Sequence, residues 1–342
     1  MTITATKTWT KQLVQDHAKT AVQVELYTLP FYLTALTSIK DTSHPAYKSI
    51  LSICIEEMLH LQLAANLCLA LDTKPEFPAP TYDGTPIPYL DPNNPTTGHH
   101  KLINAQLDAL NTTTLDLMLD IETPSGLEQH RHPEKGIWKI IDLLEDSLEA
   151  RWHLQHHLTP QYPYDTIGEM YNALIAGIVV VGKDNFSWTT RNQQAAWTSE
   201  AFTQIITKFE DAEEAVKTIS LQGEGTTTGK DRYAIPENYR LKSEVMDDKS
   251  FNEFSHYERL LNIKNQGLPE VYGTNNNQEN QQAQQQALAN LQSTFADLLT
   301  ELDSIWNIGK DITQDNNFWH PMLGLLKAAQ GCWQAGVIPK WS

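Results

Sequence analysis

The chain has 342 residues, and its 25 basic and 42 acidic side chains give a formal net charge of −17 at pH 7. This charge argues against nucleic acid or an anionic membrane as a partner, because phosphate groups bind to basic surfaces. No apolar run reaches the roughly 20 residues of a membrane-spanning helix, and the N-terminus lacks the basic and apolar regions of a secretory signal. We therefore expect a cytoplasmic protein that binds neither nucleic acid nor membrane.

The spacing of apolar residues predicts an all-α chain, because strand signals are weak. Helices are expected over 10–36, 45–71, 111–121, 137–158, 166–181, 199–221 and 247–264, followed by a terminal pair over 287–306 and 318–335. The short link 38–44 predicts that the first two helices are antiparallel neighbours. We expect a proline-rich loop over 74–95 and a disordered or mobile loop over the Asn/Gln-rich stretch 274–286.

Three cysteines fall in helical or tail segments without the spacing of a metal site: Cys54, Cys68 and Cys332. We expect them to be small core side chains in a reducing compartment.

The first predicted helix carries a carboxylate on its core face. At about 100° per residue, its polar side chains form one stripe, which comprises Gln12, Asp16, Lys19, Gln23 and Thr34. Glu25 points nearly opposite to this stripe, among apolar residues. A solvated glutamate would lie in the stripe, so we expect Glu25 to be buried.

The second predicted helix has a Glu-x-x-His pair on its apolar side. Glu57 lies among apolar residues and His60 at the edge of the same face, about one turn away. The other side of the helix can face water or other polar groups, and it comprises Ser52, Glu56, Gln62 and Asn66. The same spacing recurs at Glu253 and His256 in the predicted helix 247–264. That helix is less apolar, so an exposed pair is the alternative there.

A fourth helix offers Glu169 on a face of small residues, which would let another helix approach closely. Glu169 also fits a capping box with Thr166, in which its side chain would bond back to the helix start. Both interpretations remain open. The other candidates for the fourth carboxylate are Glu122, Glu213 and Glu224.

Several buried carboxylates need a counter-charge. Burying each ion costs several kcal/mol, against a net domain stability of roughly 5–15 kcal/mol. The helices concerned show no core-facing Lys or Arg in the sequence pattern, so two divalent cations would balance four carboxylates. One Glu from each of two helices and Glu-x-x-His from each of two others is the di-iron or di-manganese pattern of four-helix bundles. Carboxylates with one imidazole per metal suit iron or manganese better than zinc or copper.

Two further features have competing interpretations. Pro30 bends its helix beside Glu25, and the bend either opens a substrate pocket or is merely tolerated. Such a pocket would be lined by residues such as Tyr27, Tyr32 and Met58. Five histidines, at His130, His132, His153, His156 and His157, lie in or near a charged predicted helix and favour surface positions over a second metal site.

Several motifs together resemble a known family. They are LPFYLTAL (29–36) after Glu25, EEMLH (56–60), AANL (64–67), IETP (121–124), TIGEMY (166–171), QGEG (222–225) and SHYER (255–259). Their order over roughly 10–265 resembles the bacterial ferritin-like family that includes the C-terminal domain of iminophenyl-pyruvate dimer synthase from violacein- and rebeccamycin-type pathways. The resemblance implies a ferritin-like four-helix bundle with additional helices and long loops, and it implies oxidative chemistry on small molecules.

The resemblance implies six metal ligands, Glu25, Glu57, His60, Glu169, Glu253 and His256. We expect a ferritin-like metal-binding domain over 1–265, with 266–342 packed on it as an Asn/Gln-rich loop and a helical pair. The sequence lacks the large N-terminal region of the dimer synthases, so their substrate coupling is not carried over. The histidine-rich stretch matches no motif of the family.

These observations favour a non-haem oxidase or oxygenase with two Fe ions, for which Mn is an alternative. Its substrate would be a small, amino-acid-derived metabolite, and its oxidant O₂ or peroxide. One alternative is a non-catalytic or partner-dependent metal-binding protein. Another is an iron-handling ferroxidase, although the long loops suit a tight storage shell poorly. A homo-oligomer or a partner enzyme is compatible with all three hypotheses.

Overall fold

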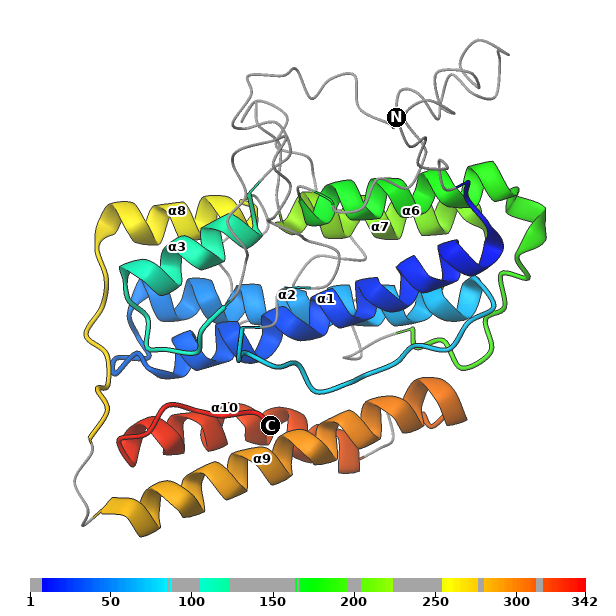
Figure 1. Ribbon diagram of the computed structural model, residues 1–342. Helices are drawn as coiled ribbons and strands as arrows, with labels where there is room; N and C mark the ends of the chain where they lie inside the picture. Colours follow the sequence, from blue (N-terminus) through cyan, green and yellow to red (C-terminus); the bar gives the residue numbers. More distant parts are fainter. Residues whose placement is uncertain are drawn as a thin grey trace, which may run out of the picture.

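The computed structural model describes residues 8–84, 87, 105–123, 164, 166–195, 204–223, 254–275, 280–311 and 316–342. The described residues are mainly helical, as predicted, and their strand-like pairing is limited to one isolated bridge between Ile39 and Val271. The helices form three layers, with the N-terminal pair in the middle (Figure 1).

The middle layer consists of α1 (Lys11–Thr37) and α2 (Pro45–Ala70), which are antiparallel neighbours as the short link predicted. The Thr10 hydroxyl accepts a hydrogen bond from the Leu13 amide and caps α1, and Pro45 occupies the first turn of α2, where its missing N–H costs nothing. By length and hydropathy α2 could cross a membrane, but 89% of its most apolar window is buried inside the fold. It is the central core helix.

A second layer completes the bundle from shorter helices. α3 (Thr112–Ile121) and α8 (His256–Gln266) cover one end of the middle layer, and α6 (Ile167–Val181) and α7 (Phe209–Gly223) cover the other (Figure 1). In place of the other two long helices of a four-helix bundle, this layer therefore contains four short ones. The pair α3 and α8 meets the pair α6 and α7 near the middle of α1 and α2 (Figure 1).

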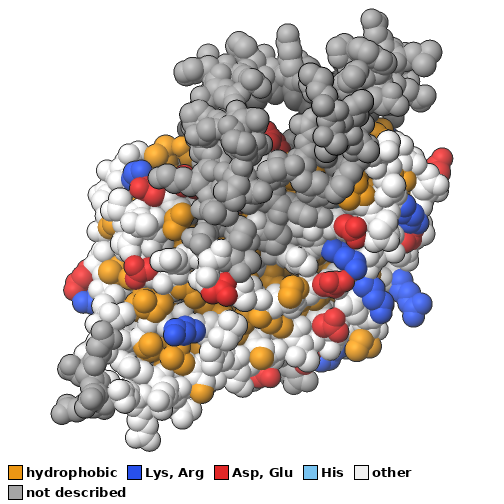
Figure 2. All heavy atoms as spheres, viewed as in Figure 1, with side chains coloured by type: hydrophobic (Ala, Val, Ile, Leu, Met, Phe, Trp, Pro, Cys, Tyr) orange, Lys and Arg blue, Asp and Glu red, His pale blue; other side chains and the backbone are white. Residues whose placement is uncertain are grey.

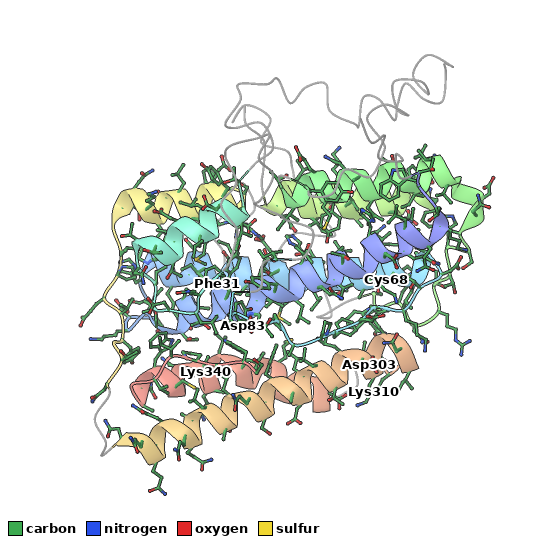
Figure 3. The ribbon with its side chains drawn as sticks, in the orientation of Figure 1. Phe31, Cys68, Asp83, Asp303, Lys310 and Lys340 are labelled. Carbon is green, nitrogen blue, oxygen red and sulfur yellow. The ribbon has the colours of Figure 1, made fainter. Side chains whose placement is uncertain are left out.

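The third layer is the C-terminal pair, α9 (Gln281–Asp303) and α10 (Asn316–Gln334). A π-helical turn, η7 (Ser304–Ile308), follows α9, and a short 3-10 helix, η2 (Lys183–Asn185), follows α6. Side chains fill the space between the layers (Figure 3). Cys54, Cys68 and Cys332 are buried and free, as the sequence indicated.

Indole groups connect the C-terminal pair to the middle layer. The Trp333 and Trp341 indoles donate to the backbone oxygen and the hydroxyl of Thr34, at 3.0 and 2.8 Å. The Trp306 indole donates to the Asn66 side chain at 2.9 Å. Thr34 is therefore buried, and its predicted place in a solvent-facing stripe is wrong because α9 and α10 cover that part of α1.

Several predicted helix boundaries are wrong. The helix expected over 199–221 begins only at Phe209, and the one expected over 247–264 begins at His256. The latter start is fixed by a capping box between Ser255 and Glu258. Residues 281–286, expected in a mobile loop, form the first turns of α9, because glutamine is a good helix former. The helix expected over 137–158 lies outside the described residues.

Charged side chains of both signs are interspersed on the face drawn in Figure 2. Several Lys or Arg side chains lie near one another at the right of that face, with Asp and Glu side chains beside them.

Candidate metal centre

A cluster of carboxylates and imidazoles lies where the short helices meet the middle layer. α1 supplies Glu25, α2 supplies Glu57 and His60, Glu122 follows the last residue of α3, and His256 is the first residue of α8. None of the five is more than 3% exposed. The sequence therefore brings five ligand-type side chains from four helices into one buried position.

The cluster consists of two overlapping groups. Glu25, Glu57 and His60 form one, and Glu57, Glu122 and His256 form the other. Within each group the three potential ligand atoms lie within 4.8 Å of one another. Glu57 belongs to both, as a carboxylate that bridges two metal ions would.

Both histidines turn the same ring nitrogen towards the carboxylates. His60 Nδ1 lies 3.7 Å from Glu25 Oε2 and 3.8 Å from Glu57 Oε1. His256 Nδ1 lies 2.9 Å from Glu57 Oε1 and 3.4 Å from Glu122 Oε1. The two imidazole rings are stacked, with their centres 5.3 Å apart.

The opposite ring nitrogens have acceptors of their own. His60 Nε2 lies 2.9 Å from Gln222 Oε1, and His256 Nε2 lies 3.0 Å from Glu56 Oε2. These partners favour the tautomer with the proton on Nε2 and the lone pair on Nδ1, which is how metal-ligating histidines are usually held. His256 Nδ1 is buried and forms no hydrogen bond of good geometry. A metal ion fits this donor set.

Each carboxylate also accepts a hydrogen bond from a buried hydroxyl. Tyr171 donates to Glu25 Oε1 at 2.5 Å, Thr28 to Glu57 Oε2 at 2.7 Å and Tyr32 to Glu122 Oε1 at 2.6 Å. In Glu25 and Glu57 the other oxygen faces the histidines. Burial and the adjacent carboxylates raise the pKa of both tyrosines well above its usual value, so the phenols remain protonated donors.

Glu56 is fully buried and belongs to a separate ion pair. The Arg259 guanidinium of α8 lies 2.5 Å from Glu56 Oε2, and it also donates to the Ser52 hydroxyl at 2.7 Å. Burial raises the pKa of Glu56, but the Arg259 charge and the contact with His256 outweigh this effect and lower it overall. The prediction that these helices offer no core-facing cation is therefore wrong. The polar side of α2 faces polar groups rather than water.

The Arg259 charge balances Glu56 but leaves three carboxylates at the centre. Burial lowers the pKa values of both histidines, yet their carboxylate neighbours raise that of His60 above its usual value and that of His256 far above it. In metal-free protein the imidazolium ions would offset the carboxylates. Metal binding would therefore release protons, because a ligating imidazole must be neutral.

Glu25, Glu57, His60 and His256 are thus brought together, while Glu122 is the carboxylate that the six-ligand set did not include. Glu169 is half-buried on α6, and its amide donates to the Thr166 hydroxyl at 3.1 Å, which is one half of the capping alternative. Glu169 and Glu213 lie outside both groups of described residues. Their roles as ligands stay predictions.

Glu253, Glu224 and the five histidines of the histidine-rich stretch lie outside the described residues. α8 begins at His256, so the start expected for this helix is wrong, and the role of Glu253 as a ligand stays a prediction.

The space between the described side chains of the centre is small. A cavity of about 10 Å³ is enclosed by carboxylate and imidazole groups and by the ends of α6 and α7, through Glu25, Glu57, His60, Glu122, Ile167, Gly168, Ile219, Ser220 and Gly223. A Cβ at Gly223 would lie 3.0 Å from Glu122 Oε2, so this close approach favours glycine.

Tyr27, Tyr32 and Met58, which were expected to line one substrate pocket, do not line a common cavity among the described residues. Tyr32 bonds to Glu122 at the centre, whereas the Tyr27 hydroxyl accepts a bond from the Ala105 amide. Met58 and Pro30 line a different, apolar cavity on the other side of α1 and α2.

Comparisons with known proteins identify the family of the chain. The ferritin-like family model matches residues 18–265. A ferritin-like protein from Caulobacter vibrioides, known from a crystal structure, is 26% identical with a TM-score of 0.68, over 98% of this chain and 99% of its own. A search of curated proteins gives no significant match. The chain belongs to the ferritin-like family.

Proposed function

We propose that the chain binds two iron ions at this centre and uses O₂ or peroxide to oxidise a small metabolite. The observation that carries the proposal is the position of Glu57, one carboxylate shared by two Glu/His groups that each contain an imidazole Nδ1. Manganese accepts the same ligands, so the choice between iron and manganese depends on supply and geometry.

The protein's side chains would hold and orient the metal pair. Glu25 and His60 would serve one ion, Glu122 and His256 the other, and Glu57 both. Five side chains for two ions would leave room for water, oxidant or further ligands. Bound iron would supply the redox chemistry, while Tyr171, Thr28 and Tyr32 fix the carboxylates by hydrogen bonds.

The substrate class rests on the family resemblance alone. The motifs shared with the dimer-synthase family favour an amino-acid-derived metabolite. The relative from Caulobacter vibrioides is described only as ferritin-like, and its description names no substrate.

A second candidate is the oxidation of iron itself, without an organic substrate. It is favoured by the cavity of about 10 Å³ among the described residues of the centre. A space of this size holds roughly one water molecule or ion. A metabolite would therefore need space outside this cavity, or the side chains that line the cavity would have to move.

The test begins with metal content in protein purified from cells supplied with iron or manganese. We expect close to two ions per parent chain, in line with the two ligand groups, and a clear loss in Glu57→Ala and His256→Ala. Glu270→Ala is the matched control, since its side chain is 78% exposed and pairs with Lys40 on the surface. No transition metal in the parent, or full content in both site variants, would contradict the proposal.

Function is then separated by a single-turnover experiment on iron-loaded protein. O₂ consumption that rises on addition of one member of an amino-acid-derived panel, with formation of an oxidised product, would support the oxidase. O₂ consumption that depends only on added ferrous iron would favour the iron-oxidising candidate.

A further inference from the structure

A second cavity lies on the side of α1 and α2 that faces away from the metal centre. It encloses about 190 Å³ between these helices and the C-terminal pair. α1 and α2 contribute residues such as Leu29 and Cys54, and α9 and α10 contribute residues such as Leu298 and Leu325. Every described residue that lines the cavity is apolar.

The lining excludes charged and strongly polar occupants. A water molecule needs two to four polar partners to stay in a cavity, and an apolar cavity of comparable size, roughly 150 Å³, stays dry and accepts benzene. An ionised group would lose its hydration without compensation. The occupant that the walls fit is therefore small, uncharged and apolar.

The wall of the cavity formed by α2 and α10 is incompletely buried among the described residues. Each helix contributes three partly buried or exposed apolar side chains to the rim: Leu51, Ile55 and Met58, and Met322, Leu323 and Leu326. Leu323 is 67% exposed. Because methionine is flexible, Met58 and Met322 can move aside without disturbing the helices.

The cavity shares its helices with the metal centre but not its polar groups. Leu26, Met58 and Leu61 line it, and each directly follows a side chain of the centre, Glu25, Glu57 or His60. Neighbouring residues on a helix point in different directions, so an occupant would contact the back of the two helices that carry the metal ligands.

We propose that this cavity is a binding site for a small, uncharged, apolar molecule the size of one aromatic ring or a short alkyl chain. The site does not depend on the proposed oxidation, since the described residues of its walls include no group of the metal centre. Its occupant would fill the space between α1 and α2 and the C-terminal pair and thereby strengthen that contact.

Benzene is the probe, with benzoate as its charged counterpart. Isothermal titration of the full chain should show saturable binding of benzene with one site, accompanied by a rise in Tm, and no binding of benzoate at the same concentrations. A crystal of the parent under xenon pressure should show xenon between α2 and α10. No saturable benzene binding, or xenon only elsewhere, would overturn the proposal.

A cavity-filling variant locates the probe. Leu298→Phe adds a ring at the cavity wall and should weaken benzene binding by about tenfold or more, because the probe loses its contacts. Leu288→Phe is the same substitution on the same helix, at a residue that does not line the cavity, and should leave the affinity unchanged. If Leu298→Phe does not fold, Cys54→Met fills the opposite wall. Equal binding in parent and filled variants would place the probe elsewhere and contradict the assignment.

Discussion

Glu56 and Glu57 are neighbours on α2 and both are buried, yet their carboxylates have different partners. Glu57 faces both histidines of the metal centre, whereas Glu56 lies against Arg259 and the outer nitrogen of His256. Glu56 thus holds His256, a candidate metal ligand, without belonging to either candidate metal-binding group. Glu56 differs from Glu57 in that its carboxylate pairs with a buried arginine, Arg259.

This arrangement predicts two separable effects of Glu56→Ala. Unfolding free energy should fall by about 3–5 kcal/mol, because the Arg259 charge would remain buried without this carboxylate. Metal affinity should fall by about 10–100-fold, because His256 Nε2 loses its acceptor. Urea denaturation of metal-free protein and competitive metal titration measure the two effects.

The double variant Glu56→Met/Arg259→Met distinguishes orientation from stability. Removing both buried charges together is often close to neutral, so most of the stability should return while the metal affinity stays low. If metal affinity returned together with stability, Glu56 would be a structural residue only.

Helical periodicity predicted the burial of the candidate ligands on α1 and α2, but it left Glu122 as one of several candidates and did not predict the buried Arg259. Glu25, Glu57 and His60 could be found because each lies among apolar residues inside a long helix. Glu122 follows the last residue of a short helix, so a helical-wheel plot does not show which way its side chain points. Arg259 could not be placed, because a guanidinium in the core depends on a partner from a different helix.

At the scale of single elements, the start of α8 positions His256, a candidate metal ligand. The Ser255 hydroxyl accepts a bond from the Glu258 amide, and the Glu258 carboxylate accepts one from the Ser255 amide. This capping box makes His256 the first helical residue. The sequence predicted a helix here but extended it to 247, since the periodicity does not mark the cap.

Ser255→Ala should therefore affect both the helix and the site. Loss of the cap should lower unfolding free energy by about 1 kcal/mol, and metal affinity should fall because His256 is less well fixed. Ser255→Thr keeps a capping hydroxyl and should restore both properties. Unchanged metal affinity in Ser255→Ala, measured by the same competitive titration, would show that other contacts fix His256.

α1 carries a buried histidine away from the centre. The two ring nitrogens of His17 lie 2.7 Å from the Leu13 carbonyl oxygen and 2.8 Å from the Tyr164 hydroxyl. Burial lowers its pKa to about 4, and the contact with the Leu13 carbonyl and the Asp16 charge oppose this effect only in part. His17 is therefore neutral in the folded protein at pH 7.

The depressed pKa of His17 predicts acid sensitivity. The unfolded chain takes up the proton near pH 6.5 and the folded chain only near pH 4. The stabilising contribution of neutral His17 is complete above pH 6.5 and is lost as pH falls towards 4, by up to ~3 kcal/mol. Urea unfolding between pH 4.5 and 7.5 should show a shallower pH dependence in His17→Gln than in the parent. Parallel curves would refute this contribution.

At the scale of the whole molecule, the C-terminal pair covers an apolar face of the bundle. The predicted pair is close to the observed α9 and α10, because both helices have strong periodic patterns. The periodic pattern did not predict where α9 and α10 pack against α1 and α2. That position depends on contacts distant in sequence, including the bonds from Trp333 and Trp341 to Thr34.

A chain that ends at residue 273 should therefore associate more strongly than the full-length chain. Removal of α9 and α10 would uncover apolar residues of α1 and α2, such as Leu29 and Leu33, and large exposed apolar patches promote association. Size-exclusion chromatography should show aggregation of the truncated chain. The full-length variant Trp341→Phe is the control, because it loses one hydrogen bond and about 1 kcal/mol but keeps the cover. A monodisperse truncated chain with the Tm and metal content of the parent would instead make the C-terminal pair an independent appendage.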